Sequence, residues 1–194
     1  MFEIQKSPFR LILFATTILI LFASSSLPAD IKAIRKQAEA GDAKAQFNIG
    51  SMYENGSGVR QDYAEAAKWY RKAAMQGAAS AQYNLGFMHL NGQGVPQDYA
   101  EAAKWYRKAA EQGDVDALRI LGLAYYLGKW VPQDFVQSYF WFSLAASRAS
   151  GDEYTQSIEA RDRIAKELTP EKLKEAQRMV REWEKSHPRK GGRS

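Results

Sequence analysis

The sequence repeats itself at a fixed interval. The fourteen residues QDYAEAAKWYRKAA occur at 61–74 and again, letter for letter, at 97–110. Trp69, Trp105 and Trp141 extend the same interval of 36 residues into a third copy. A period of this length predicts a stack of similar supersecondary units, because such a unit can bury its apolar face only against its neighbours.

Each unit is predicted to contain two helices joined by a glycine-rich turn. Apolar residues recur at helical spacing over residues 42–55, and Gly56 is expected to end that helix. The second helix should begin after Asp62, whose carboxylate caps it, with Glu65 completing a capping box three residues on. Gly77 should end it. The chain is therefore predicted to be all-α.

At these positions the chain resembles the Sel-one-like repeat (SLR), a relative of the tetratricopeptide repeat. The third copy departs from the repeat pattern at Leu118, Trp130 and Tyr139, as suits a terminal repeat that faces a cap. The resemblance implies an α/α superhelical solenoid of helix-turn-helix repeats with helical caps. It rests on Ala45, Ile49, Gly50, Tyr53, Gly56, Gly58, Val59, Asp62, Ala66, Trp69, Ala73 and Ala74 and their counterparts one period later.

The flanking segments complete the expected organisation. Residues 31–38 align with the second helix of a repeat shifted by one period, and Thr169 with Pro170 predicts the start of a last helix. In that helix Leu173, Ala176, Val180 and Trp183 would cover the open end of the stack. The expected segments are a signal peptide or membrane anchor (1–29), an N-terminal half-repeat (30–41), three repeats (42–77, 78–113 and 114–149), a C-terminal helical cap (150–185) and a disordered basic tail (186–194).

The N-terminus has the layout of a secretory signal peptide. Lys6 and Arg10 precede the apolar run Leu11–Ala23, and small residues follow it. Thirteen apolar residues fall short of the about 20 that cross a bilayer, which favours cleavage and export over an uncleaved anchor. By resemblance to bacterial SLR proteins, we expect the periplasm of a Gram-negative bacterium or secretion. The alternative is a protein anchored to the inner membrane and facing the periplasm.

The sequence contains little that could do chemistry. It has no cysteine and two histidines, and His89 occupies the repeat position of Tyr53 and Tyr125, where a packing role is expected. Some cysteine-rich relatives in the SLR family have been associated with β-lactams, but this chain lacks their cysteine pairs. We therefore predict no catalytic residue, no cofactor and no metal, and hence no enzyme.

A binding surface is the better prediction. Stacked helix pairs form a concave face lined by the first helix of each unit, and such faces take up peptides. Phe87 and Leu123 are the strongest candidates because the equivalent position holds Ser51, whereas Phe47 and Tyr83 are expected to pack against neighbouring helices. By resemblance to the tetratricopeptide register, the groove residues are Lys44, Phe47, Ser51, Glu54, Ser80, Tyr83, Phe87, Leu90, Asp116, Arg119, Leu123 and Tyr126.

The expected function is a non-catalytic protein-interaction or scaffold module that binds a protein or peptide in this groove. The net charge of +5 is mild and its one cluster lies at 188–193, so no nucleic-acid partner is expected. Membrane contact is expected only through the N-terminal segment, and a monomer is favoured. The alternative is an envelope glycan- or β-lactam-binding protein or accessory hydrolase, in which exposed Trp130 and Tyr126 stack on sugars.

Overall fold

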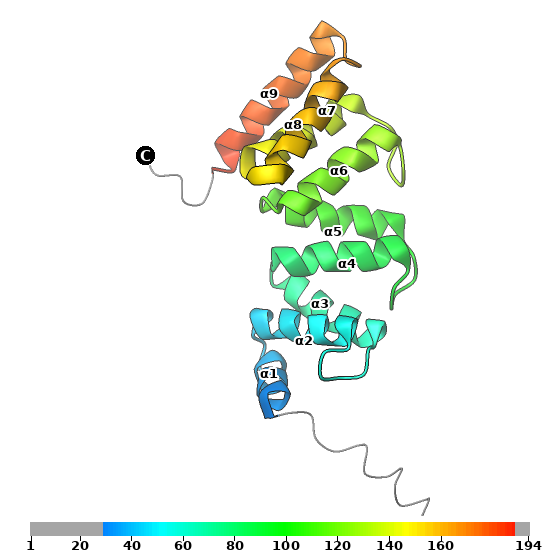
Figure 1. Cartoon of the computed structure of the whole chain (residues 1–194), viewed down its shortest axis with the longest axis vertical. Coiled ribbons are helices and arrows are strands. Elements are labelled where there is room, and N and C mark those ends of the chain that lie inside the picture. The colour runs from blue at the N-terminus through cyan, green and yellow to red at the C-terminus, as the bar shows by residue number, and fades with distance from the viewer. Residues whose placement is uncertain (1–28, 189–194) are drawn as a thin grey trace, which may run out of the picture.

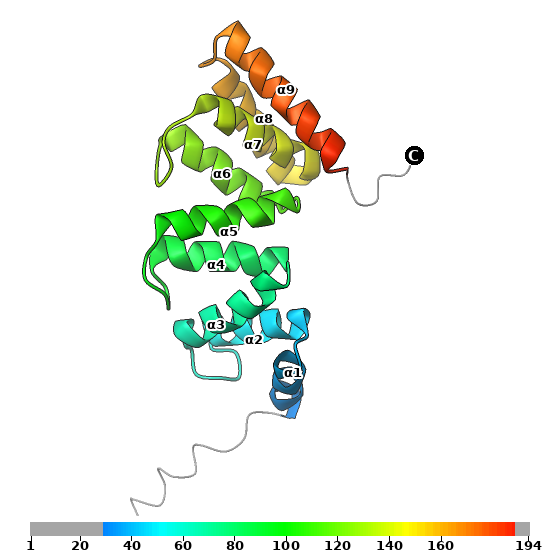
Figure 2. The same ribbon diagram turned by 180° about the vertical axis from the view of Figure 1, so that it is seen from behind.

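The computed structural model describes residues 29–188, and the expected signal segment and most of the basic tail lie outside them. The described residues form nine α-helices that follow one another along the long axis of the molecule (Figures 1 and 2). The all-α solenoid is thereby confirmed. The helices are α1 (Ala29–Glu39), α2 (Ala43–Asn55), α3 (Tyr63–Met75), α4 (Ala79–Asn91), α5 (Tyr99–Glu111), α6 (Val115–Leu127), α7 (Phe135–Arg148), α8 (Gly151–Ala165) and α9 (Pro170–Ser186).

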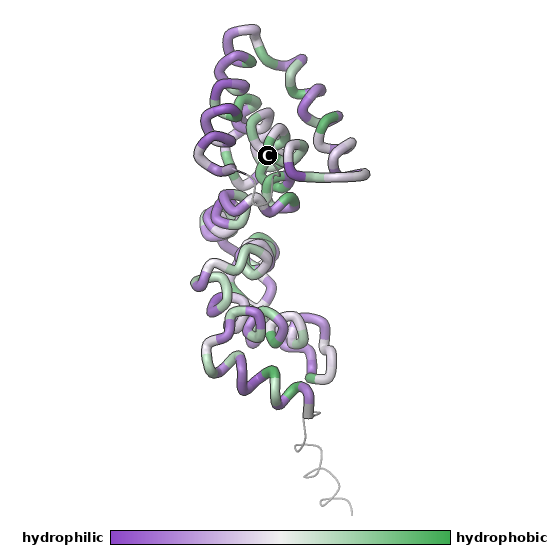
Figure 3. The backbone as a smooth tube through the Cα atoms, turned by 90° about the vertical axis from the view of Figure 1, so that its left-hand side faces the viewer, coloured by the Kyte–Doolittle hydropathy of each residue, from purple (hydrophilic) through white to green (hydrophobic). Residues whose placement is uncertain are grey.

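The helices pack in chain order. The pairs α2 with α3, α4 with α5, and α6 with α7 each form one helix-turn-helix unit, and α3 and α5 pack on the first helix of the next unit. Helix α1 packs on α2, while α8 and α9 both pack on α7. Hydrophobic and hydrophilic residues alternate along most of the backbone (Figure 3), as expected for helices that keep one side exposed to solvent, whereas α7 is buried on several sides. Within residues 29–188 no helix is long and apolar enough to cross a membrane.

The helix caps differ in one respect from the expected capping box. The Asp62 carboxylate accepts from the backbone N–H groups of Ala64 and Glu65, at 2.9 and 3.0 Å, as predicted. The Glu65 carboxylate does not return this bond, because it pairs with Lys68 at 2.5 Å and the Asp62 N–H donates to the Tyr53 carbonyl at 2.9 Å. The prediction of a reciprocal box was therefore wrong: the turn already satisfies the backbone group that Glu65 would have bound.

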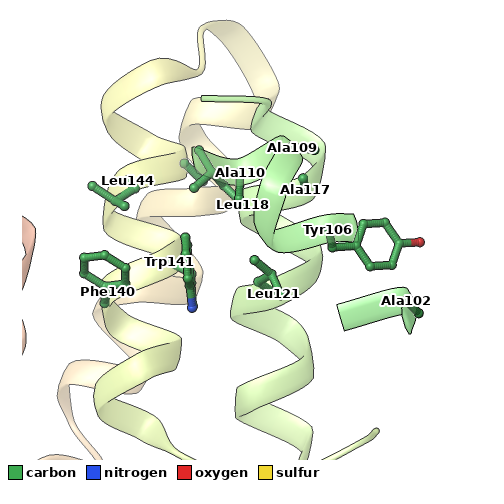
Figure 4. Close-up of a cluster of buried hydrophobic side chains, with 11 residues drawn as sticks. Ala102, Tyr106, Ala109, Ala110, Ala117, Leu118, Leu121, Phe140, Trp141 and Leu144 are labelled. Atoms are coloured by element: carbon green, nitrogen blue, oxygen red, sulfur yellow. The ribbon is translucent and has the colours of Figure 1, made fainter. Parts of the chain in front are cut away.

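Adjacent aromatic residues in each second helix belong to two different core clusters. Trp69 packs with Ile31, Ala38 and Ile49 of the preceding helices α1 and α2. Its neighbour Tyr70 belongs to the cluster that includes residues of the following helix, α4. Trp105 and Tyr106 repeat this division one unit later. Figure 4 shows the cluster in which Trp141 of α7 meets Leu121 of α6. The repeated Trp-Tyr pair thus joins consecutive units.

Glycines let the first helix of each unit approach the aromatic ring of the second. A Cβ atom on Gly86 would lie 3.2 Å from the Tyr106 ring, and one on Gly50 would lie 2.7 Å from Tyr70. Such contacts are too close for a side chain without movement of the ring. The small residues found at these repeat positions are therefore required by packing.

Buried glutamines link consecutive repeats. The Gln82 amide donates to the Ala74 carbonyl at 3.0 Å and its oxygen accepts from Gln112 at 2.7 Å, and Gln46 occupies the same place one unit earlier. In the third unit Leu118 replaces this glutamine and is fully buried in the core. The polar link ends there, where the stack meets its cap.

Trp130 occupies the turn position of Gly58 and Gly94 and takes the same left-handed conformation, with φ 50° against 72° and 68°. Its ring lies on that of Tyr106, with the ring centroids 5.9 Å apart. Packing of the indole offsets the strain that a side chain carries at this φ. Tyr139, the other bulky departure, packs against the cap.

The glycines of the turns provide a test of this packing. At Gly94 (φ 68°) an added Cβ would overlap the Tyr63 carbonyl group, whereas at Gly77 (φ 89°) it would meet nothing within 4 Å. Gly77→Ala should lower the free energy of unfolding by about 1 kcal/mol, the cost of the backbone conformation alone. Gly94→Ala should cost at least about 2 kcal/mol more, because backbone atoms must move. Urea denaturation measures both, and equal losses would contradict the close approach of this turn to α3.

Candidate functional site

The face formed by the outward sides of α2, α4 and α6, here called the first-helix face, carries all twelve predicted groove residues. None of them belongs to the buried core. Phe87 and Leu123, the two favoured residues, are 38% and 48% exposed. The other exposed members are Lys44, Ser80 and Asp116, and the half-buried ones are Phe47, Ser51, Glu54, Tyr83, Leu90, Arg119 and Tyr126.

One end of this face is hollowed. A cavity of about 410 Å³, here called the end hollow, lies where α4 and α6 meet α7 and α8. Four predicted residues come together in it, while Phe87 lies outside its lining. The lining consists of Tyr83, Asp116, Arg119, Ile120, Leu123, Phe142, Gln156 and Ala160.

The polar groups of the end hollow hold one another in place. The Arg119 guanidinium donates to the Gln156 side-chain oxygen at 2.5 Å, and another of its nitrogens lies 3.7 Å from the Asp116 carboxylate. Burial raises the pKa of the Tyr83 phenol, and the nearby Asp116 carboxylate raises it further. Tyr83 therefore stays neutral and Arg119 is the one cation of this lining. Such a hollow suits an apolar side chain flanked by a carboxylate or carbonyl group.

Several predicted residues serve the fold instead. The Phe47 ring packs on that of Tyr70, with centroids 5.5 Å apart, and Tyr70 donates its hydroxyl hydrogen to Glu54 at 2.5 Å. Leu90 packs at the edge of the core cluster around Tyr106. Of the twelve predicted groove residues, Phe47, Glu54 and Leu90 therefore take part in packing, and the surface left for a partner is smaller than expected.

Sequence reasoning missed the contribution of the cap. Gln156 and Ala160 of α8 and Phe142 of α7 belong to the lining of the end hollow. The polar sequence of α8 carries no signal for this role, because the cap has no counterpart in the repeat period. Helix α8 packs mainly on α7, shares a core cluster with α9 and accepts a hydrogen bond from Arg119 of α6.

The residues proposed for sugar stacking are less open than expected. Trp130 is half-buried on Tyr106, and Tyr126 is half-buried with its ring 5.8 Å from that of Phe135. The expectation that both are exposed was wrong, because each ring fills a gap beside a neighbouring helix.

His89 has the packing role that its repeat position predicts. It is buried, and its Nε2 accepts from the Arg71 guanidinium at 3.2 Å. One unit later the Arg107 guanidinium donates in the same way to the Tyr125 hydroxyl, at 2.9 Å. In the part of the chain that the structure describes, no three His, Cys, Asp or Glu side chains are grouped as metal ligands.

The geometry defines the class of protein: a stack of helix-turn-helix units whose paired aromatic residues join each unit to the next. Three consecutive matches to the Sel1 repeat cover residues 43–77, 79–114 and 115–150. The chain belongs to the Sel1 repeat (SLR) family.

Solved structures agree with this assignment. The chain is similar to c5321, described as a protective antigen of uropathogenic Escherichia coli with an SLR fold, at 39% identity and a TM-score of 0.71. That match covers 81% of this chain but 33% of c5321, so the chain spans about a third of that protein's length. No curated protein matches the chain.

Two shorter proteins are matched over nearly their whole length. A Sel1 repeat protein from Oxalobacter formigenes is 34% identical, with a TM-score of 0.60, over 67% of this chain and 98% of that one. Cysteine-rich protein B of Helicobacter pylori shares the fold at 24% identity and a TM-score of 0.54, over 68% of this chain and 98% of its own. Each of these three similar proteins is bacterial.

Leu121 and Leu123 of α6 form a matched pair for testing which residues the fold needs. Leu121 is fully buried and Leu123 is 48% exposed in the end hollow. Leu121→Ala should lower the free energy of unfolding by about 2–5 kcal/mol, and Leu123→Ala by less than about 1 kcal/mol. Chemical denaturation measures both. A large loss of unfolding free energy for Leu123→Ala would mean that the fold, and not a partner, requires a leucine at this position.

Proposed function

We propose that this protein is a non-catalytic interaction module of the bacterial cell envelope that binds a protein or peptide on its first-helix face. The observation that carries the proposal is the end hollow, where Leu123 stays exposed beside Arg119 although the core does not require it there. Exposed apolar side chains gathered in a concave site beside one charged group are typical of peptide recognition.

The location in the envelope rests on the sequence and on the relatives. The basic and apolar N-terminal segment has the layout of an export signal. The relative c5321 is described as a protective antigen, which suits a protein that meets the outside of the cell. A periplasmic or secreted protein is therefore proposed, with an inner-membrane anchor as the alternative if the segment is retained.

The non-catalytic role rests on the chemistry of the site. The end hollow is lined by one cation, one carboxylate that lies beside it, and otherwise neutral side chains. It contains no serine, cysteine or histidine that could act as a nucleophile or general base. Glycan binding has less support than peptide binding, because Trp130 and Tyr126 pack within the fold.

A crosslinking pulldown from the envelope fraction tests the proposal. The variant Phe87→Ala, Arg119→Glu removes one exposed ring and reverses the one positive charge of the hollow. The matched control Tyr154→Ala, Lys174→Glu makes the same two kinds of change at exposed positions of the cap. Circular dichroism should show both variants folded.

The expected result is a partner that crosslinks to the unchanged chain and to the control, but at least tenfold more weakly to the Phe87 and Arg119 variant. Loss of the contact that Phe87 would bury against the partner should weaken binding about tenfold, and reversal of the Arg119 charge should weaken it by a similar factor. A partner captured equally by all three proteins would place the interaction elsewhere on the surface.

A further inference from the structure

A second surface carries charge in register with the repeat. In α3, Lys68, Arg71 and Lys72 lie at helical spacing on the side opposite the buried alanines, and all three are exposed. The same triad occurs one period earlier in α1 and one period later in α5. These nine side chains are here called the basic ladder: beyond the α3 triad it contains Lys32, Arg35 and Lys36 in α1, and Lys104, Arg107 and Lys108 in α5.

The ladder stops where the cap begins. One further period brings Phe140, Ser143 and Leu144 to the same positions of α7, and Phe140 and Leu144 are buried in a core cluster that includes residues of α9. The cations thus mark the second helices whose outward side no other helix covers. Six of the nine cations are lysines, and the three triads occupy equivalent positions of α1, α3 and α5.

Most of this charge is not neutralised within the protein. Among residues 29–188, acidic partners within ion-pair distance exist for Arg35, Lys68 and Lys104, in pairs with Glu39, Glu65 and Glu101. The other ladder lysines have none within that range. Lys72 and Lys108 instead lie over the Trp69 and Trp105 rings, at 4.0 and 4.5 Å from the ring centroids.

From this arrangement we infer that the basic ladder is a docking surface for an anionic lipid bilayer. Lysine is a compact charge without the planar fork by which arginine recognises single carboxylates or bases, so a row of lysines suits a diffuse layer of phosphates. The indole rings under Lys72 and Lys108 are buried, and hence cannot stack on nucleic-acid bases.

Two further observations favour a membrane over a protein partner. Met75, which is 75% exposed, follows Lys72 on the same helix and offers an apolar group beside the cations. The sequence also predicts that the chain meets a membrane during export, because the apolar run Leu11–Ala23 of the export signal ends nine positions before Lys32. This surface is distinct from the first-helix face, so a docked protein would keep its end hollow free.

Vesicle cosedimentation of the chain from residue 29 onward tests the inference. This part contains every core cluster described above and should fold on its own, which circular dichroism checks. The probes are vesicles containing phosphatidylglycerol, and phosphatidylcholine vesicles as the neutral comparison.

Two variants, each with four substitutions, lose the same amount of positive charge. The ladder variant replaces Lys32, Lys36, Lys72 and Lys108 by Gln, and the control replaces the exposed cap lysines Lys166, Lys172, Lys174 and Lys185 by Gln. Each cation near an anionic surface contributes roughly a fivefold gain in partitioning. The ladder variant, which loses four cations, should therefore bind roughly 600-fold more weakly, and the control should lose much less.

A third variant separates charge from packing on the tryptophans. Replacement of the four ladder lysines by Arg keeps the charge and should retain binding, and added salt should release the unchanged chain. Equal losses in the ladder and cap variants, or a loss with Arg, would overturn the inference. So would ladder-dependent binding to duplex DNA or polyglutamate without binding to the anionic vesicles.

Discussion

The close approach of paired helices is the constraint on which the rest of the structure depends. Each first helix places a glycine against the ring of its second helix, as Gly86 does against Tyr106. The same Tyr106 ring also packs in the cluster that contains Leu118 and Leu121 of the next unit. The same contact therefore sets the spacing within a unit and the joint between units.

This constraint explains why the sequence is so strictly repeated inside the stack and so different at its end. In α3 and α5 the aromatic pair meets similar neighbours on both sides, so identical residues fit. In α7 the residue after Trp141 is Phe142, which meets the cap cluster around Ile164 and Ala176. Leu118, Tyr139 and the buried Phe140 follow the same change of neighbour, since each replaces a residue suited to another repeat.

The two surfaces of the solenoid differ in what covers them. On the first-helix face, α8 lies beside α6 and helps to line the end hollow next to Arg119. Second helices present an outer side that a cap either covers, as at Phe140, or leaves to solvent, as at Lys72. The proposed peptide site and the proposed membrane-docking surface therefore lie on different helices of each unit.

Much of this protein follows from the sequence alone. The 36-residue period, the capping aspartates and the inward alanines determine the helix pairs and their order, because each unit can bury its apolar face only against a copy of itself. The exposure of Phe87 and Leu123 also follows, since Ser51 shows that the position does not require bulk. Only the tertiary structure revealed two contacts outside the repeat pattern: Arg119 donates to Gln156 of the cap, and the Trp130 ring packs on Tyr106. Those contacts join residues that no period relates, so their partners become visible only when the helices are placed in space.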